Sequence, residues 1–156
     1  MKKYIFVEIV CLILTAVFIV SSIDGDRKTL KTAKEITDDI VHLLEDDSLI
    51  EREKPLIKDT FDMDLSDFSS VSYYSSDDIM DVTEIFVGVL KSDFKEETKN
   101  AFITYVENEY NLFNGYAPDQ AAYIDAYILN ESSGAVCFCV AENRDAIYEA
   151  FLNAVE

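Results

Sequence analysis

The sequence predicts an α+β domain in which a small antiparallel sheet of about four strands carries helices on one face. Apolar residues recur with helical spacing at both ends of the chain after residue 24, and they change to strand-like runs in between. The predicted elements follow the order α-(α)-β-β-α-β-β-α, in which strands occur in adjacent pairs. Adjacent strand pairs favour hairpins and antiparallel pairing rather than a parallel sheet.

The first predicted helix covers roughly residues 27–44, and its apolar residues fall on one face. Those residues are Ala33, Ile36, Ile40, Leu43 and Leu44. A short helical turn is predicted at 55–60, because Pro55 suits an early helical position. His42 is the single histidine of the chain and lies beside acidic residues in the last turn of the first helix, where we interpret it as a structural residue.

Four strands are predicted in the remainder of the chain. The first pair covers 71–74 and 83–91, and the second of these is apolar on both faces, which indicates a central strand. The second pair covers 123–129 and 135–141, joined by a hairpin at 130–134 that is rich in Asn, Ser and Gly.

Two further helices are predicted, one between the strand pairs and one at the end. Asp93 and Glu96 resemble a capping box that opens the longer helix, and Gly115 suits its C-terminal cap. The core-facing residues of this helix are Phe102, Tyr105, Val106, Tyr110 and Phe113. The last helix has the clearest helical spacing, at Ile147, Ala150, Phe151, Ala154 and Val155.

The first 23 residues form a separate N-terminal segment. Lys2 and Lys3 precede an apolar run at 4–23 that is broken only by Glu8. Twenty helical residues span about 30 Å, the hydrocarbon thickness of a bilayer, and the two lysines favour a cytoplasmic N-terminus. We therefore predict a signal anchor or signal peptide at 1–23 and an acidic extracytoplasmic α+β domain at 24–156.

Two alternatives remain for this segment. Its length favours an uncleaved anchor, which makes the chain a single-pass protein of the cell membrane with its body outside the cytoplasm. The small residues Ser21 and Ser22 also allow signal-peptide cleavage, which would release the body as a secreted protein.

Charge limits the partners of the domain. Lys2, Lys3 and Glu8 are the only charged residues among the first 23, so the remainder carries one more negative charge than the −18 of the whole chain. Such a field repels a phosphate backbone, and nucleic-acid binding is therefore not predicted. Basic peptides, cations and a purely solvating role are compatible with it.

No catalytic residue, cofactor site or metal site is predicted. The sequence has no glycine-rich phosphate loop and no Gly-x-Ser-x-Gly pattern. Cys137 and Cys139 point to the same face of one strand with Cα atoms roughly 6.5–7 Å apart, at the limit of a disulfide, and we interpret them as buried, poorly reactive thiols. Asp62, Asp64 and Asp67 have the spacing of a calcium loop, but the Gly and Glu that such a loop requires are absent.

Two alternatives to a binding domain stay open. The acidic loops suit a calcium-responsive surface module, since exposed carboxylates can bind calcium weakly outside the cell. Glu107 and Glu109 suit a carboxylate-dependent hydrolase, although they project to different sides of one helix.

Four features occur in order along the body: the patch Phe61-Asp62-Met63-Asp64, the strand Glu84-Ile85-Phe86-Val87, the turn Tyr116-Ala117-Pro118, and the hairpin, strand and helix around and after Gly134. With them the body resembles the bacterial family called domain of unknown function 4358, found mainly in Firmicutes. The resemblance implies a secreted or lipid-anchored protein and supplies no catalytic residue. The chain departs from the family in lacking the lipoprotein cysteine and in carrying Cys137 and Cys139.

The leading hypothesis is a membrane-tethered extracytoplasmic interaction or ligand-binding domain without catalysis. Its partners would be the membrane, through residues 4–23, and a protein or small-molecule ligand. The candidate interaction surface comprises Tyr116, Pro118 and Glu84. We favour an inward position for Tyr116, between the long helix and the sheet, because an aromatic residue beside a helix cap commonly packs on that helix. The alternative is an outward position, in which Tyr116 serves as an aromatic anchor for a ligand.

Overall fold

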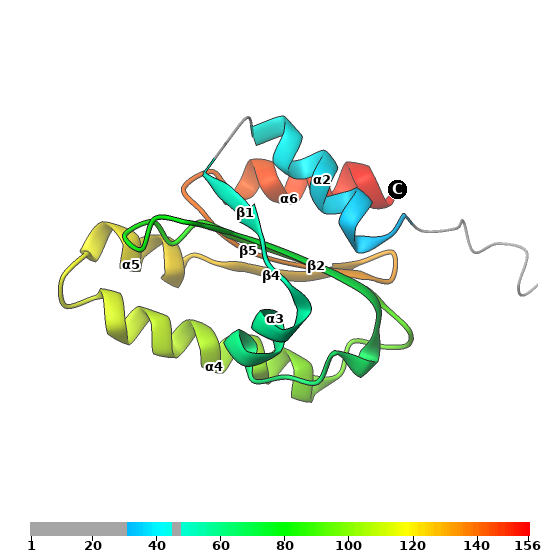
Figure 1. Cartoon of the computed structure of the whole chain (residues 1–156), viewed down its shortest axis with the longest axis horizontal. Helices are drawn as coiled ribbons and strands as arrows, with labels where there is room; N and C mark the ends of the chain where they lie inside the picture. The colour runs from blue at the N-terminus through cyan, green and yellow to red at the C-terminus, as the bar shows by residue number, and fades with distance from the viewer. Residues whose placement is uncertain (1–30, 45–47) are drawn as a thin grey trace, which may run out of the picture. The chain divides into compact units, whose positions relative to one another are not determined.

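One antiparallel sheet forms the centre of the computed structural model, which describes residues 31–44 and 48–156 (Figure 1). The strands are β1 (Leu49–Glu51), β2 (Phe68–Ser76), β3 (Glu84–Leu90), β4 (Ile128–Ser132) and β5 (Ala135–Val140). They lie in the order β1-β2-β3-β5-β4, and each neighbouring pair is antiparallel. The predicted α+β class with an antiparallel sheet is confirmed, and the short edge strand β1 is added to the four strands that were expected.

Helices precede β1, connect β1 to β2 and β3 to β4, and follow β5. Within the described residues they are α2 (Ala33–Leu44), α3 (Lys54–Phe61), the 3-10 turn η1 (Leu65–Asp67), α4 (Glu96–Phe113), α5 (Pro118–Asp125) and α6 (Arg144–Val155). Apart from β1, η1 and α5, the elements follow the predicted order. Residues Lys31–Glu156 form one compact unit.

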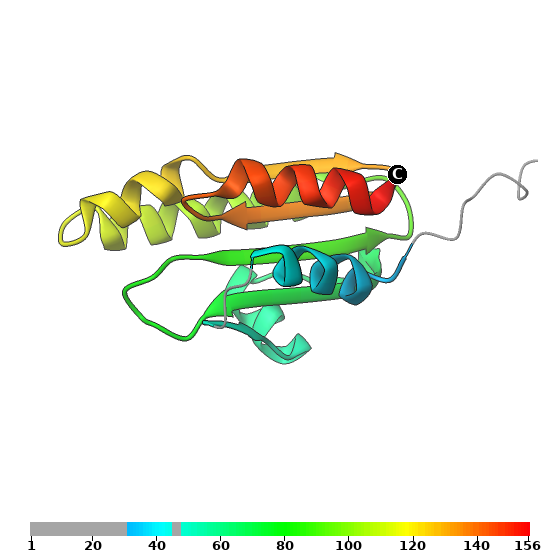
Figure 2. The same cartoon turned by 90° about the horizontal axis from the view of Figure 1, so that it is seen from above.

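The helices cover both faces of the sheet. α2 and α6 pack together on one face, α2 over β2 and β3 and α6 over β5 and β4, whereas α3 and α4 lie on the opposite face (Figures 1 and 2). The prediction that the helices pack on one face is therefore wrong. The physical reason lies in β3 and β5, whose side chains are mostly buried on both sides of the pleat and need cover on each.

The start of α4 differs from the expected capping box. The helix begins at Glu96 behind Lys95, and the N-cap residue makes no side-chain cap. Glu96 and Glu97 place two negative charges in the first turn, where they favour the positive end of the helix dipole. The predicted capping box of Asp93 and Glu96 is therefore not formed. Two acidic side chains in the first turn of α4 stabilise the start of the helix instead.

The end of α4 also differs from the prediction. Gly115 does not adopt the left-handed conformation. Instead, the N–H of Ala117 donates to the carbonyl of Phe113 at 2.8 Å, and the chain passes directly into α5. Because α5 occupies residues up to Asp125, the strand expected at 123–129 begins only at Ile128.

The predicted hairpin between β4 and β5 is confirmed, but its turn has two residues, because residues 130–132 of the expected connection belong to β4. Ser133 and Gly134 have φ angles of 51° and 79°. Two successive positive φ angles are typical of a type I′ turn, whose twist matches that of the flanking strands. Ser132 accordingly pairs with Ala135 immediately beyond the turn.

The two faces of the sheet have cores of different composition. On the side of α3 and α4, large aromatic rings contact one another, among them Phe61, Phe86, Phe102 and Phe138. On the side of α2 and α6, the buried residues are smaller: Ala33, Ile36, Ile40, Ile85, Val87, Cys137, Cys139 and Ile147, with Phe151 as the large exception. The expectation that the two cysteines are buried is confirmed, and both are free thiols. Burial and the hydrogen bond between them raise the pKa of the Cys137 thiol.

No described helix combines the length and apolar character needed to cross a bilayer. The apolar run at 4–23 lies outside the described residues, as do residues 27–30 of the first predicted helix. The membrane segment therefore stays a prediction.

Candidate functional site

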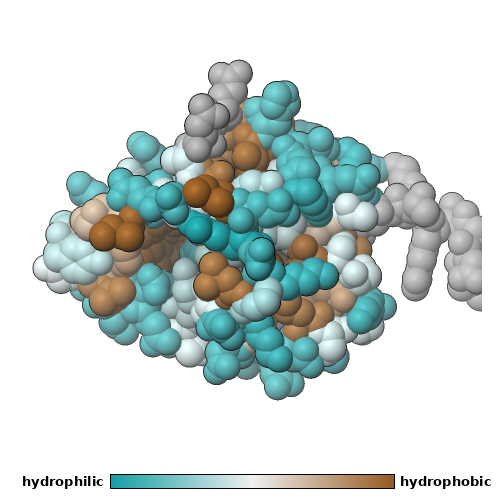
Figure 3. Space-filling model, in the orientation of Figure 1, coloured by the Kyte–Doolittle hydropathy of each residue, from teal (hydrophilic) through white to brown (hydrophobic). Residues whose placement is uncertain are grey.

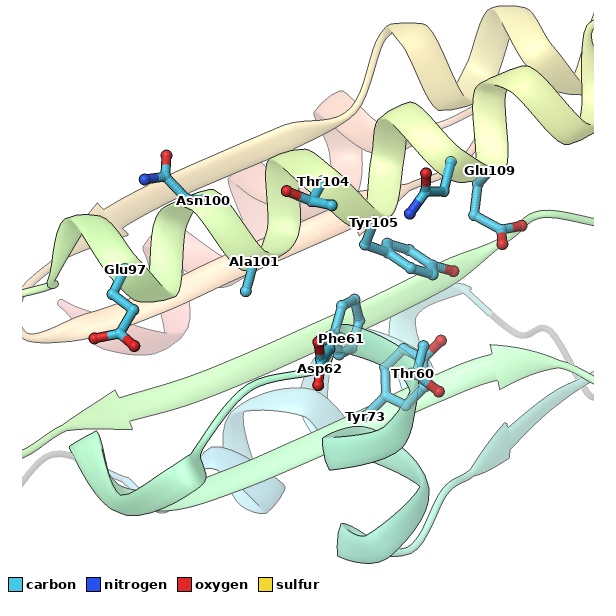
Figure 4. A pocket seen from close by; sticks show the side chains of 11 residues that line it. Thr60, Phe61, Asp62, Tyr73, Glu97, Asn100, Ala101, Thr104, Tyr105 and Glu109 are labelled. Carbon is cyan, nitrogen blue, oxygen red and sulfur yellow. The ribbon is translucent and has the colours of Figure 1, made fainter.

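A groove of about 730 Å³ opens between α3 and α4 (Figure 4). Two rows of α4 side chains line it, and within each row the i, i+4 spacing keeps the members on one side of the helix. One row comprises Glu97, Ala101, Tyr105 and Glu109, and the other Asn100, Thr104 and Asn108. The opposite wall consists of Thr60, Phe61 and Asp62 at the end of α3, together with Tyr73 of β2.

Phe61 holds the end of α3 against α4. Its ring lies 4.7 Å from the ring of Tyr105 and 4.8 Å from that of Phe102, measured between centroids. Asp62 then ends the helix with a φ angle of 46°, a left-handed conformation that is uncommon outside glycine. The groove is therefore built on a rigid aromatic support.

A buried carboxyl group lies behind the aromatic wall of the groove. Glu84, the first residue of β3, is only 6% exposed. The hydroxyl of Tyr73 donates to its Oε2 at 2.6 Å, and the hydroxyl of Tyr105 donates to the same oxygen at 3.0 Å. A strand, its neighbour and a helix thus each contribute one member to a Glu84–tyrosine cluster.

Burial governs the protonation of this cluster. Loss of solvent raises the pKa of Glu84 to about 7, although the hydrogen bonds from Tyr73 and Tyr105 act in the opposite direction, and the nearby Glu109 carboxylate raises it further. Burial also raises the pKa of Glu109 and, together with the charge of Glu84, that of both tyrosine hydroxyls. A pKa of about 7 allows the charge of Glu84 to change near neutral pH.

A second hollow, of about 200 Å³, adjoins the groove across the tyrosine pair. Tyr73, Tyr105 and Glu109 line both spaces, while Glu84 lines the second. The loop between β2 and β3 forms much of its wall and is held to α5 by a hydrogen bond from the N–H of Val82 to Oε1 of Gln120, 3.1 Å long. The Glu84–tyrosine cluster therefore lies between two hollows.

A family model of a domain of unknown function, DUF4358, matches residues 45–141. The chain belongs to the DUF4358 family. The matched residues include all five strands together with α3, α4 and α5, and hence the groove and the Glu84–tyrosine cluster. Comparison with curated proteins and with solved structures gave no match.

The candidate surface residues of this DUF4358 domain do not form one exposed site. Tyr116 is 54% exposed, and its ring contacts that of Phe113 at a centroid distance of 5.2 Å in a tilted arrangement, so the prediction that it plugs the space between helix and sheet is wrong. The reason is the continuous connection from α4 to α5, which keeps Tyr116 on the outside. Pro118 is the first residue of α5, a position that suits proline because its backbone N–H would have no partner within the helix. Its side chain is exposed. Glu84, in contrast, is buried in the cluster.

Several carboxylates of the acidic loops accept hydrogen bonds from other groups of the chain. Asp64 accepts from the N–H of Ser66 at the start of η1, and Asp67 accepts from Lys95 and from Thr98. In the β2–β3 loop, Asp78 accepts from the N–H of Met80 and Asp81 from that of Thr83. Across residues 31–44 and 48–156, no three His, Cys, Asp or Glu side chains converge as metal ligands would.

Of the carboxylate pair considered for a hydrolase, only Glu109 lines the groove, while Glu107 is exposed on α4. The structure instead brings Glu109 near Glu84, from another element. A signal for this was present in the sequence, because alternation along β3 puts Glu84 on the same face as the buried Phe86. A second signal was the i, i+4 spacing of Tyr105 and Glu109 on one helix.

Proposed function

We propose that this chain is a membrane-tethered extracytoplasmic domain that binds a polar ligand in the α3–α4 groove and catalyses no reaction. The observation that carries the proposal is the groove of about 730 Å³, which has the size of ordinary ligand sites. Its walls combine aromatic rings with amide, hydroxyl and carboxylate groups, the mixture that fixes the orientation of a bound molecule.

The surface supports a site in the groove rather than a broad apolar interface. Figure 3 shows apolar side chains on this face in separate groups among hydrophilic ones. Large contiguous apolar patches are what usually mark protein interfaces. A hollow with convergent polar groups is therefore the better-supported binding site on this face.

The composition of the groove favours binding over catalysis. Among the described residues, the lining of the groove contains no Ser, Cys, His or Lys. Thr60 and Thr104 therefore have no His or Lys beside them in the lining that could activate a hydroxyl group as a nucleophile. Both hydrogen bonds of the Glu84–tyrosine cluster are directed at one carboxyl oxygen, which positions that group firmly.

Filling the groove tests the binding site. Thr104→Trp introduces a large ring into the groove, and Ile103→Trp places the same ring on the neighbouring position of α4 outside it. The full chain in a neutral detergent would be screened by calorimetry against capped amino acids, amino sugars and neutral sugars. We expect a probe that binds the wild type and Ile103→Trp but not Thr104→Trp. Equal binding by all three chains would place the ligand elsewhere.

Location requires a separate test. The lysines at the N-terminus and the apolar run at 4–23 support an anchor that leaves the acidic body outside. Protease added to intact protoplasts should then digest the body, whereas a cytoplasmic control protein should survive. Survival of the body while a known external protein is digested would contradict the proposed location.

Glu84 and Glu109 favour a carboxylate-dependent hydrolase as a second candidate. A carboxyl group with a pKa of about 7 is in the range of a general acid, and Glu109 provides a second carboxylate near it. Hydrolysis of a glycoside or ester that is lost in Glu84→Gln and retained in Glu107→Gln would establish this candidate. Absence of such turnover would leave the binding function as the better explanation.

A further inference from the structure

We infer that the ligand of the α3–α4 groove carries a primary ammonium group, which binds beside Glu109 and the Glu84–tyrosine cluster while the rest of the ligand lies along α4. This inference rests on the binding function proposed above and specifies its ligand class. Four observations support it: the acidic charge of the lining, the lack of a positively charged partner for Glu84, the aromatic wall of the groove, and the row of polar side chains on α4.

The charged side chains that line the two hollows are all acidic. Asp62, Glu97 and Glu109 line the groove, and Asp78, Asp81 and Glu84 line the second hollow. No Lys, Arg or His of the described chain lines either space. A carboxylate or phosphate ligand would meet only like charges, whereas a cation would relieve their repulsion.

Glu84 lacks a positive partner. Within the described residues Glu84 makes no ion pair, and its two hydrogen bonds come from the neutral hydroxyl groups of Tyr73 and Tyr105. Burial of a charge is costly unless the charge is paired. A bound cation would supply the missing partner, and it would do so most strongly when Glu84 is ionised.

The aromatic wall also favours a cation. Phe61, Tyr73 and Tyr105 are packed edge to face with centroid separations of 5.3 Å and 4.7 Å from the Phe61 ring. The faces of such rings carry partial negative charge and attract ammonium groups. In Figure 4 the hydroxyl end of Tyr105 points toward the end of the groove where Glu109 lies.

The remaining lining favours an organic cation over a metal ion. Asn100, Thr104 and Asn108 form a row of amides and hydroxyls along α4, which suits an extended polar molecule. A divalent metal needs several oxygen ligands around one point, and no three acidic, His or Cys side chains converge in the described residues. The polar row and the acidic end together fit a molecule with a neutral body and one ammonium group.

Binding should depend on the protonation of Glu84. The groups that face it are Tyr73 of β2, Tyr105 and Glu109 of α4, and Asp78 and Asp81 of the β2–β3 loop; the lining that α5 contributes is the apolar Ile124. A cation binds more tightly to the ionised carboxylate, so the affinity for capped lysine, whose ammonium group stays charged over this range, should increase from pH 6 to pH 8.

Calorimetry on the full chain in neutral detergent tests the inference with paired probes. Nα-acetyl-lysine-N-methylamide would be compared with its Nε-acetylated form, and glucosamine with N-acetylglucosamine. We expect at least one ammonium probe to bind at least about tenfold more tightly than its acetylated partner. Capped lysine as the tighter ligand would indicate a peptide source, and glucosamine an amino-sugar source.

Variants distinguish a bound ammonium group from general attraction to an acidic protein. Glu109→Gln should weaken the ammonium probe about tenfold, and Glu107→Gln, which removes the same charge from the same helix outside the groove, should leave it unchanged. Equal weakening by both variants would overturn the inference. Because these substitutions leave the aromatic core in place, they remain informative if Glu84→Gln does not fold.

The remaining outcomes separate the inference from the proposed function. Acetylated probes that bind as tightly as the free amines, and that Thr104→Trp excludes, would overturn the ammonium assignment and support binding in the groove. No binding by any probe, at pH 6 or pH 8, would overturn both. An affinity that does not change with pH would contradict the role of Glu84.

Discussion

The two faces of the sheet are packed by different kinds of side chain and have different relations to the surface. Under α2 and α6, the core is mostly aliphatic. Its polar side chains include two small hydroxyl groups: Thr37 donates to the carbonyl of Ala33, and Ser70 accepts from the N–H of Ala33. Under α3 and α4, rigid rings meet edge to face and enclose a carboxyl group. Aliphatic side chains interdigitate closely, whereas rings on the other face leave two hollows at their margin. The comparison indicates that both faces stabilise the fold and that the candidate site lies on the aromatic face.

The largest expected effects come from removing one large ring from each face. Phe102 and Phe151 are both fully buried, so Phe102→Ala and Phe151→Ala should each lower the free energy of unfolding by about 4 kcal/mol. Only Phe102→Ala should also abolish ligand binding, because Phe61 of the groove packs on Phe102. Denaturant unfolding followed by tyrosine fluorescence measures the first effect, and calorimetry the second. Loss of binding in Phe151→Ala as well would remove the distinction between the faces.

A pH effect on stability should belong to the aromatic face. The pKa of Glu84 rises from 4.5 to about 7 on folding, so between these values the folded chain holds more protons than the unfolded chain. The stability that Glu84 contributes is therefore present at low pH and is lost as the pH rises from 4.5 to 7. The free energy of unfolding should decrease by up to about 3 kcal/mol over this range.

Unfolding measured at a series of pH values in wild type, Glu84→Gln and Glu107→Gln isolates this contribution. The difference between wild type and Glu84→Gln should change across the window, and the difference between wild type and Glu107→Gln should not. Parallel profiles for all three chains would show that Glu84 is not the group that titrates.

A smaller effect is expected from the closest approach within the aromatic core. A Cβ atom on Gly88 would lie 2.5 Å from two atoms of the Phe68 ring, which itself packs on Phe86. Gly88→Ala should therefore lower the free energy of unfolding by about 2 kcal/mol. Gly115→Ala is the matched control, because nothing lies within 4 Å of its Cβ position. A neutral Gly88→Ala would show that the ring can move aside.

The smallest effect is expected at Tyr116, outside both cores. Its exposed ring contacts that of Phe113, and such a pair contributes about 1 kcal/mol. Tyr116→Ala should lower the free energy of unfolding by about that amount or less, measured by the same denaturant experiment. A loss near 3 kcal/mol would restore the inward position that the sequence suggested.

The elements that the sequence predicted best are those whose own residues show the structure, through apolar spacing or through turn-forming residues. The continuous apolar run of β3, the spacing of α6 and the turn at Ser133-Gly134 each carry their structure in local residues. β1 has only three residues and forms because β2 pairs with it, so no local pattern marks it. Burial of β3 and β5 on both sides is the evidence that helices cover both faces of the sheet. The prediction of helices on one face considers each strand separately and so does not use this evidence.

The candidate site was less accessible to prediction because its members come from separate elements. Tyr73 and Glu84 meet across the β2–β3 hairpin, but only the tertiary fold brings Tyr105 of α4 to the same carboxyl oxygen. Glu84 was singled out with Tyr116 and Pro118 as a surface residue, whereas its place on the core-facing side of β3 makes it a buried acid. A charged residue at a core position was the stronger signal, since such residues are rarely buried without a specific role.

The sheet order β1-β2-β3-β5-β4 implies a sequence of folding events. The β2–β3 and β4–β5 hairpins pair neighbouring segments, whereas β3–β5 pairing must close a loop that contains α4, α5 and β4. Closure of a long loop costs more entropy than formation of a hairpin, so the central pairing should be the slow step. Tyr73 and Glu84 meet within the first hairpin, but Tyr105 can join them only when α4 docks. The groove should thus be among the last parts of the molecule to form, so a chain in which the groove is present has completed its fold.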